Sequence, residues 1–169
     1  MKAAGVLLAI TLALVLQTML ARFVIRGTVA VDVVLVVVVY VALASGSVTG
    51  LLSGAVAGLV QDALSSGVIG IGGLSKTVVG FLAGIVGSQF IVVQPLSRFV
   101  VFFASTVLHA GLFIGLYVVL GLRQFGSPVA ATAGQAVANA VVGVVAFQLV
   151  ELLPGAVERR RAQKARIRR

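Results

Sequence analysis

Long apolar runs separated by short polar or glycine-rich breaks form the main pattern of this chain. The runs cover residues 3–21, 33–44, 48–64, 74–93, 98–122 and 129–153. Backbone groups in lipid must be hydrogen-bonded within the spanning segment, so even the valine-rich run 33–44 is predicted to be a helix rather than an isolated strand. A spanning helix needs about 20 apolar residues. The pattern therefore predicts an all-α, polytopic membrane bundle of about six transmembrane helices.

The breaks between the runs differ in kind. Residues 22–32 are mixed and predict a short re-entrant or surface piece, whereas the three residues 45–47 predict a tight turn between antiparallel helices. The glycine-rich stretch 65–73 is predicted to be a loop that is too flexible for a stable helix. Prolines are expected to end two spans, at Gln94-Pro95 and at Pro154-Gly155.

Composition supports the membrane interpretation and limits the chemistry. Hydrophobic residues make up 60% of the 169 residues, charged residues only 10%, and the mean hydropathy is +1.21. Soluble domains have about 45–50% apolar and about 25% charged residues. Six spans leave no room for a separate soluble domain, so we divide the chain into a transmembrane domain (1–154) and a basic tail (155–169). With no cysteine and one histidine, we expect no disulfide, metal or other cofactor.

The net charge of +9 is concentrated in the tail. Its basic residues are Arg159, Arg160, Arg161, Lys164, Arg166, Arg168 and Arg169. Such a cluster directly after a span marks the cytoplasmic side, and six spans then place the N-terminus in the cytoplasm as well. Anionic lipid is one expected partner, at about 1 kcal/mol per basic residue near the surface. Nucleic acid is not expected, because no recognition module accompanies the tail.

Small residues recur at helical spacing in two of the runs. Gly50, Gly54 and Gly58 form one stripe, and Gly80 and Gly84 lie in the next run. Glycine lets helix backbones approach closely in lipid, where no hydrophobic force drives helices together. The stripes predict either an interface with a partner protein or packing within the chain. Internal packing is favoured, since six helices must pack somewhere.

Asp62 continues the first glycine stripe and is the most conspicuous single residue. An acid at such a position is costly unless it is paired or hydrated. Lys76 is the expected partner, with Arg22 and Arg26 as alternatives. A structural ion pair is favoured over a proton or substrate site, because no second acid lies nearby in sequence.

Other polar residues lie inside the predicted spans. Thr132, Gln135 and Asn139 share one helical face by their spacing, and Gln17 and Thr18 lie on the first span. They predict interhelical hydrogen bonds or, alternatively, a polar cavity. His109 is expected to be a hydrogen-bonded core residue, since no carboxylate shares its helix.

Catalytic machinery is not evident in the sequence. Residues 70–77 (GIGGLSKT) approach a phosphate-loop pattern, but Ser75 stands where that pattern has glycine, and no strand–loop–helix context accompanies it. No serine has a base partner in a known arrangement, and no carboxylates are paired at a spacing suited to hydrolysis. We therefore expect a protein that is not an enzyme.

Several motifs resemble those of the MreD family. Leu16-Gln17 matches a family motif late in the first span, and Val31-Asp32-Val33 stands where the family has Pro-Asp-Leu, without the proline. The glycine-rich stretch from Gly50 to Gly84 resembles the family's most characteristic region. Within it, the family aspartate corresponds to Asp62, the loop glycines to Gly67 and Gly70, and the last glycine pair to Gly80 and Gly84. The resemblance is best over residues 17–87.

This resemblance implies a non-enzymatic scaffold of the bacterial cell-elongation (rod) complex in the inner membrane. The implied partners are MreC and, through it, the MreB cytoskeleton and the RodA–penicillin-binding-protein synthase that builds peptidoglycan. The family is also similar in fold to the S components of energy-coupling-factor vitamin transporters. That similarity implies the alternative function, a solute-binding component with a wet pocket near Gln17, Asp62, Gln135 and Asn139.

Overall fold

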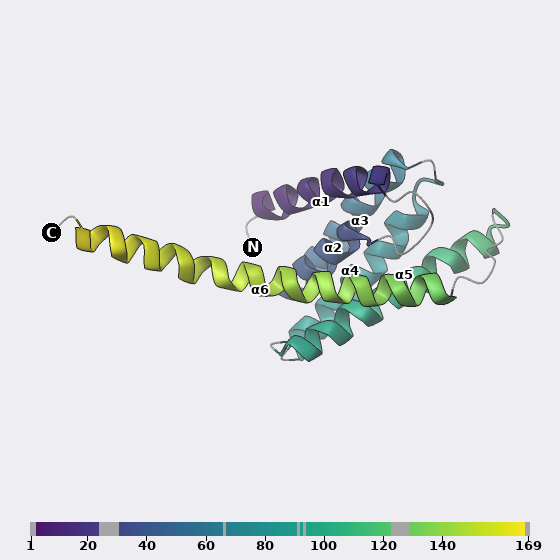
Figure 1. The fold of residues 1–169 in the computed structure, drawn as a ribbon. Coiled ribbons are helices and arrows are strands. Elements are labelled where there is room, and N and C mark those ends of the chain that lie inside the picture. Colours follow the sequence, from purple (N-terminus) through teal and green to yellow (C-terminus); the bar gives the residue numbers. More distant parts are fainter. Residues whose placement is uncertain are drawn as a thin grey trace.

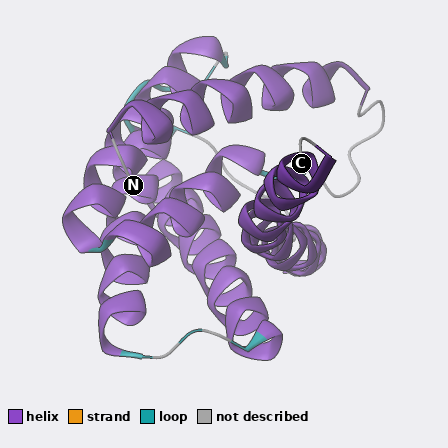
Figure 2. Ribbon diagram, turned by 90° about the vertical axis from the view of Figure 1, so that its left-hand side faces the viewer, coloured by secondary structure: helices purple, strands orange, loops and turns teal. Residues whose placement is uncertain are grey.

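The computed structural model describes residues 3–23, 31–65, 67–90, 92, 94–122 and 129–167, with side chains except at 21–23 and 153–167. Its elements are α1 (Ala3–Phe23), α2 (Val33–Ser45), α3 (Ser47–Leu64), α4 (Ile71–Gln89), α5 (Pro95–Val119) and α6 (Val129–Ile167). These residues contain helices and no strand (Figures 1 and 2). The predicted all-α membrane bundle is confirmed.

The helix α2 lies at the centre and contacts each of the other five helices. It has no polar face, because its sequence VVLVVVVYVALAS is apolar on every side. Two hydrophobic clusters form on it: Val36 and Val39 pack toward Val79 and Phe102, while Val34 and Val38 pack in the cluster that includes Ile10 of α1. The valine-rich run is thus the buried axis of the fold, and the other helices surround it.

Five of the helices are long and apolar enough to cross a membrane. The sixth, α2, has 13 residues, or about 20 Å at about 1.5 Å per residue, which is short of the roughly 30 Å hydrocarbon core. Helices α1 and α3 run parallel, since Ala3 lies beside Thr49 at one end and Thr18 beside Leu64 at the other. The chain must therefore return across the bundle between Phe23 and Ser47, and α2 supplies most of that return.

Several predicted boundaries are wrong, including the end of α4, which lies at Gln89 rather than near residue 93. Helix α4 begins at Ile71, so the glycine-rich loop ends at Gly70, whose φ of 107° lies in the left-handed region that glycine tolerates. Helix α6 continues through Pro154-Gly155 to Ile167 and projects well beyond the bundle (Figure 1). A proline inside a helix removes one hydrogen bond and bends the axis, but the helix can resume after it. By contrast, Pro95 is the first residue of α5, where its missing N–H costs nothing.

Candidate functional site

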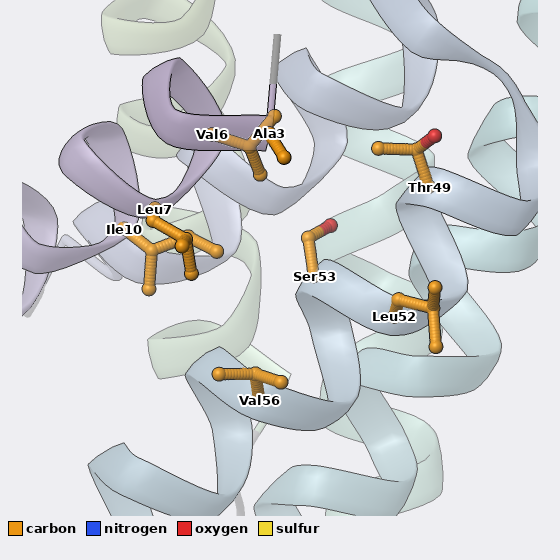
Figure 3. Close-up of a pocket in the computed structure, with 8 residues that line it drawn as sticks. All are labelled: Ala3, Val6, Leu7, Ile10, Thr49, Leu52, Ser53 and Val56. Carbon is orange, nitrogen blue, oxygen red and sulfur yellow. The ribbon is translucent and has the colours of Figure 1, made fainter.

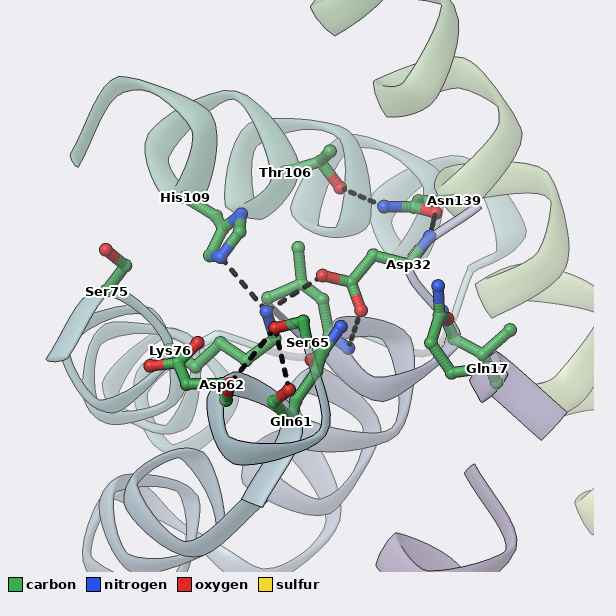
Figure 4. A network of polar contacts seen from close by, with 12 residues as sticks. Gln17, Asp32, Gln61, Asp62, Ser65, Ser75, Lys76, Thr106, His109 and Asn139 are labelled. Atoms are coloured by element: carbon green, nitrogen blue, oxygen red, sulfur yellow. Dashed lines mark hydrogen bonds and ion pairs between the residues drawn. The ribbon is translucent and has the colours of Figure 1, made fainter. Parts of the chain in front are cut away.

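The first turn of α2 carries the densest group of polar contacts in the described bundle (Figure 4). Asp32 caps this helix: its Oδ1 accepts a hydrogen bond of 2.9 Å from the backbone N–H of Leu35. The N–H of Asp32 donates to Oδ1 of Asn139 at 2.9 Å, and the N–H of Val33 donates to Oε1 of Gln17 at 2.8 Å. The N–H groups at a helix start lack partners within the helix. Side chains from α1 and α6 satisfy two of them here, in a place that water does not reach freely.

A buried ion pair joins the same turn to α4. The ammonium of Lys76 lies 2.8 Å from Oδ2 of Asp32, and the two side chains are 4% and 9% exposed. The same ammonium lies 3.1 Å from Nε2 of His109 on α5. A lysine ammonium can only donate, so Nε2 accepts, and His109 is neutral with its proton on Nδ1. Asp32, Lys76 and His109 form what we call the α2 cluster, which is electrically neutral as a whole.

Asn139 extends this network to α6 and is fully buried. Its Nδ2 donates to Oγ1 of Thr106 at 3.2 Å, and the Thr106 hydroxyl donates to the carbonyl of Phe102 at 2.9 Å. Figure 4 shows Asn139 and Lys76 approaching Asp32 from different helices. The structure thus brings together four residues that were singled out from the sequence: Gln17, Asp32, Lys76 and Asn139.

The predicted ion pair between Asp62 and Lys76 is wrong. Oδ2 of Asp62 instead accepts hydrogen bonds from the backbone N–H groups of Gly70, at 2.9 Å, and Gly73, at 3.0 Å. A carboxylate is favoured there because a helix N-terminus carries free N–H groups and partial positive charge. Asp62 therefore caps α4, and Lys76, one turn further along, is left for Asp32. Of the alternative partners, Arg26 and the side chain of Arg22 lie outside the described residues.

The glycine stripes lie between α3 and α4. A Cβ placed on Gly50 would strike the carbonyl oxygen of Gly80, and one on Gly54 would strike that of Lys76. A Cβ on Gly58 would lie 2.6 Å from Cα of Gly73. Gly84 continues the contact against the backbone of Ser47. These positions form what we call the α3–α4 seam, in which two backbones touch without side chains between them.

A second ion pair, which sequence reasoning missed, joins the start of α5 to α6. The Arg98 guanidinium makes two hydrogen bonds to the Glu151 carboxylate, one of them 2.9 Å long, and lies 4.1 Å from the centre of the Phe147 ring. The signal was present, since these are opposite charges at the same end of two consecutive spans.

The remaining predicted polar residues are Gln135 and Thr132 on α6 and Thr18 on α1. Gln135 is half-buried on α6, one turn before Asn139. Thr132 lines an apolar hollow of about 330 Å³ between α5 and α6. The hydroxyl of Thr18 donates to the carbonyl of Val15 in its own helix, 2.8 Å away.

His109 is buried and hydrogen-bonded, as the sequence predicted, and a carboxylate lies near it although its own helix carries none. The carboxylate comes from Asp32, far away in the chain, and reaches His109 through Lys76. Such a contact between helices has no sequence spacing that would indicate it. Among the described residues, no group of three or more His, Cys, Asp or Glu side chains is placed to hold a metal ion.

Comparison with protein families matches residues 2–154 to the model of rod shape-determining protein MreD. The chain belongs to the MreD family. The match covers the whole bundle, including the last two spans, where the sequence resemblance was weak. Searches of curated proteins and of solved structures give no match. Membership in the MreD family implies a role in rod shape determination. The MreD family is a structural, shape-determining family and is not known as a family of enzymes. Together with the five apolar helices, the family match indicates a membrane protein.

Proposed function

We propose that this MreD protein is a non-enzymatic scaffold of the rod complex in the bacterial inner membrane. In this proposal it binds MreC and helps couple the MreB cytoskeleton to peptidoglycan synthesis by the RodA–penicillin-binding-protein synthase. The family match over residues 2–154 is the observation that carries the proposal. The polar contacts of the bundle support it. Asp32, Lys76 and Asn139 all bind other groups of the same chain, as a packing unit requires.

A lipid-facing groove offers a surface for a partner helix. Two adjacent hollows of about 380 and 460 Å³ run along α1 and α3 and share Leu7, Ile10 and Val56. Figure 3 shows the first of these hollows. Their lining is apolar apart from a few hydroxyls such as that of Thr49. In lipid, helix association depends on close van der Waals contact, which a groove provides and a convex surface does not. We propose that the transmembrane helix of MreC packs in this groove, since the glycine stripes are already used within the chain.

Co-purification tests this proposal directly. The tagged chain is co-expressed with the MreC of the same organism and isolated in mild detergent, with retained MreC as the measurement. Val56→Trp places a bulky ring in both hollows, and Val100→Trp is the matched control, because Val100 is similarly exposed to lipid but lies on α5. We expect Val56→Trp to weaken MreC retention about tenfold, or about 1.4 kcal/mol, and Val100→Trp to leave it unchanged.

The two parts of the proposal fail differently. If the unmodified chain never retains MreC, the scaffold function is wrong. If both tryptophan variants retain MreC equally well, the scaffold stands and the groove is not the binding surface.

The alternative, a vitamin-binding S component, gains no support from the site. Oε1 of Gln17, both amide atoms of Asn139 and Oδ2 of Asp62 hydrogen-bond within the chain. A polar ligand would have to displace these contacts. We therefore propose the scaffold function alone.

A further inference from the structure

Helix α1 is held more lightly than the other long helices of the described bundle. Only 17% of its apolar span is buried, against 22–50% for the other four. Within the described residues, α1 contacts α2 and α3 and none of the remaining helices. Its contact with α3 is interrupted by the two hollows of the groove. The position of α1 along the bundle therefore depends mainly on its contact with α2.

The apolar part of that contact has little to fix α1 lengthwise. A buried stripe on α1 packs with valines that lie one turn apart on α2. The stripe consists of Val6, Ile10 and Ala13, and the valines are Val34, Val38 and Val41. Because the facing residues of α2 are all valine, sliding α1 by one turn would replace most valine contacts by other valine contacts. The apolar side chains hold α1 against α2 but specify its register weakly.

Gln17 continues the same stripe and is its polar member. The spacings from Val6 through Ile10 and Ala13 to Gln17 are those of a heptad seam. Oε1 of Gln17 accepts a hydrogen bond of 2.8 Å from the backbone N–H of Val33, and Figure 4 shows Gln17 beside the start of α2. Val33 is the first residue of α2, so its N–H has no acceptor within the helix. One turn further along α2, the N–H groups are already bonded within the helix.

The contact between Gln17 and Val33 can therefore form in one register only. A shifted α1 would separate the Gln17 oxygen from the Val33 N–H, in a bundle where lipid supplies no replacement partner. In coiled coils, a single polar residue within an apolar seam specifies the register of the helices in the same way.

We infer that Gln17 sets the register of α1 on α2, and so aligns α1 with α3 in the proposed MreC groove. The use of this alignment in MreC binding rests on the proposed function, because α1 and α3 are the two walls of that groove. In the register seen here, Leu7 and Ile10 of α1 and Val56 of α3 line both hollows. Gln17 lines neither hollow, so it is a positioning residue for the partner surface.

Distances between spin labels on α1 and α3 measure this register. The chain has no cysteine, so labels can be placed in pairs in the full-length protein in nanodiscs, without MreC, and read by double electron–electron resonance. One pair is Met19→Cys with Val48→Cys, and the other is Gly5→Cys with Leu64→Cys, all at exposed positions. Because α1 and α3 run parallel, each pair joins opposite ends of the two helices. A slide of α1 lengthens one distance and shortens the other.

Gln17→Met removes the acceptor and keeps the length of the side chain. We expect a second population in both pairs, displaced by about one turn, roughly 5 Å, and in opposite directions in the two pairs. Thr18→Val is the matched control, because the Thr18 hydroxyl donates to Val15 within α1, and we expect its distances to equal those of the unmodified chain. Unchanged distances in Gln17→Met would overturn the inference. Broadening or lengthening in both pairs would also overturn it, since this would be general loosening of α1.

A second variant moves the glutamine instead of removing it. In Ala13→Gln, Gln17→Ala, the new amide oxygen reaches the N–H of Val33 only if α1 advances by four residues, about 6 Å, toward its own C-terminal end. That slide places Ala9 in the buried site that Ala13 leaves, so the stripe stays apolar there. We expect the distance between positions 19 and 48 to lengthen and that between positions 5 and 64 to shorten, each by about 5 Å.

This signed shift decides the matter even if Gln17→Met does not yield folded protein. Distances that stay at the values of the unmodified chain in the double variant would contradict the inference. MreC retention by the unmodified chain is measured separately. If α1 shifts as expected but the unmodified chain retains no MreC, the register role of Gln17 stands and the scaffold function is wrong. If MreC is retained but α1 does not shift, only the register role is wrong.

Discussion

The α3–α4 seam and the α2 cluster hold this bundle together by opposite means. In the seam, Gly50 and Gly54 bring two backbones into direct contact, and Asp62 closes one end by binding backbone N–H groups. In the cluster, the closing contacts run between side chains from different helices, with Lys76 facing Asp32 and His109. Both regions contain an aspartate at a helix start, yet among the side chains that the structure describes only Asp32 has a charged partner.

This difference predicts different responses to change. Backbone contacts in the seam tolerate loss of a side chain but not the addition of one. In the cluster, even the loss of one side chain is expected to be costly, because removing one charge leaves the other charge buried and unpaired. Asp62 was the conspicuous acid in the sequence, whereas the contacts of Asp32 lead us to expect that Asp32 contributes more to stability.

The largest effect is expected for Asp32→Ala. Lys76 would remain 3% exposed without its carboxylate, beside a histidine that can supply only a neutral acceptor. Breaking a buried pair in this way costs about 3–5 kcal/mol. The measurement is the unfolding midpoint of the purified protein during titration with a denaturing detergent.

The double variant Asp32→Ala, Lys76→Met is the matched control. Removing both charges leaves no unpaired ion, so we expect it to recover more than half of the stability that Asp32→Ala loses. If the double variant is as unstable as the sum of the two single variants, the ion pair is not what stabilises the start of α2.

The seam was easier to predict from the sequence than the cluster, for a physical reason. Glycines at spacing four, such as Gly50 and Gly54, share one helix face whatever the tertiary structure, so close helix packing could be expected there. The start of α4 was harder to place, because the glycines at 72 and 73 argue against helix unless Asp62 caps it. The apolar runs located most helix boundaries within a few residues, since lipid imposes their length.

The cluster depends on contacts that sequence spacing does not contain. Asp32 and Lys76 are separated by two helices and a turn, and His109 lies on yet another helix. Lys76 was assigned to Asp62 because it lies at the start of the next span, on the same side of the bundle as Asp62. The assignment is wrong because the backbone N–H groups of Gly70 and Gly73 hydrogen-bond to the carboxylate of Asp62 instead. Which buried charges pair with each other depends on how the helices pack, so the pairs can be read only from the tertiary structure.

A smaller effect is expected in the seam for Gly54→Ala. The added Cβ would collide with the backbone carbonyl of Lys76, so α3 and α4 must separate, at a cost of about 1–3 kcal/mol for overpacking. Gly111→Ala is the matched control, because a Cβ there meets nothing within 4 Å. We expect the unfolding midpoint to fall for Gly54→Ala and to stay level or rise slightly for Gly111→Ala. Equal shifts in both variants would mean that the two helices are not in backbone contact.

The smallest effect is expected for Asp62→Asn, and it tests the comparison most directly. Asparagine keeps an oxygen that can accept from the N–H groups of Gly70 and Gly73, so only the charge at the start of α4 is lost. A charge near a helix N-terminus contributes about 0.3–1 kcal/mol, and complete loss of a cap, as in Asp62→Ala, costs about 1–2 kcal/mol.

The expected order of destabilisation is therefore Asp32→Ala, then Asp62→Ala, then Asp62→Asn, measured by the same detergent titration. If Asp62→Asn destabilises the protein as much as Asp32→Ala does, the carboxylate of Asp62 must balance a buried positive charge after all. The contrast between an aspartate that caps and an aspartate that pairs would then be wrong.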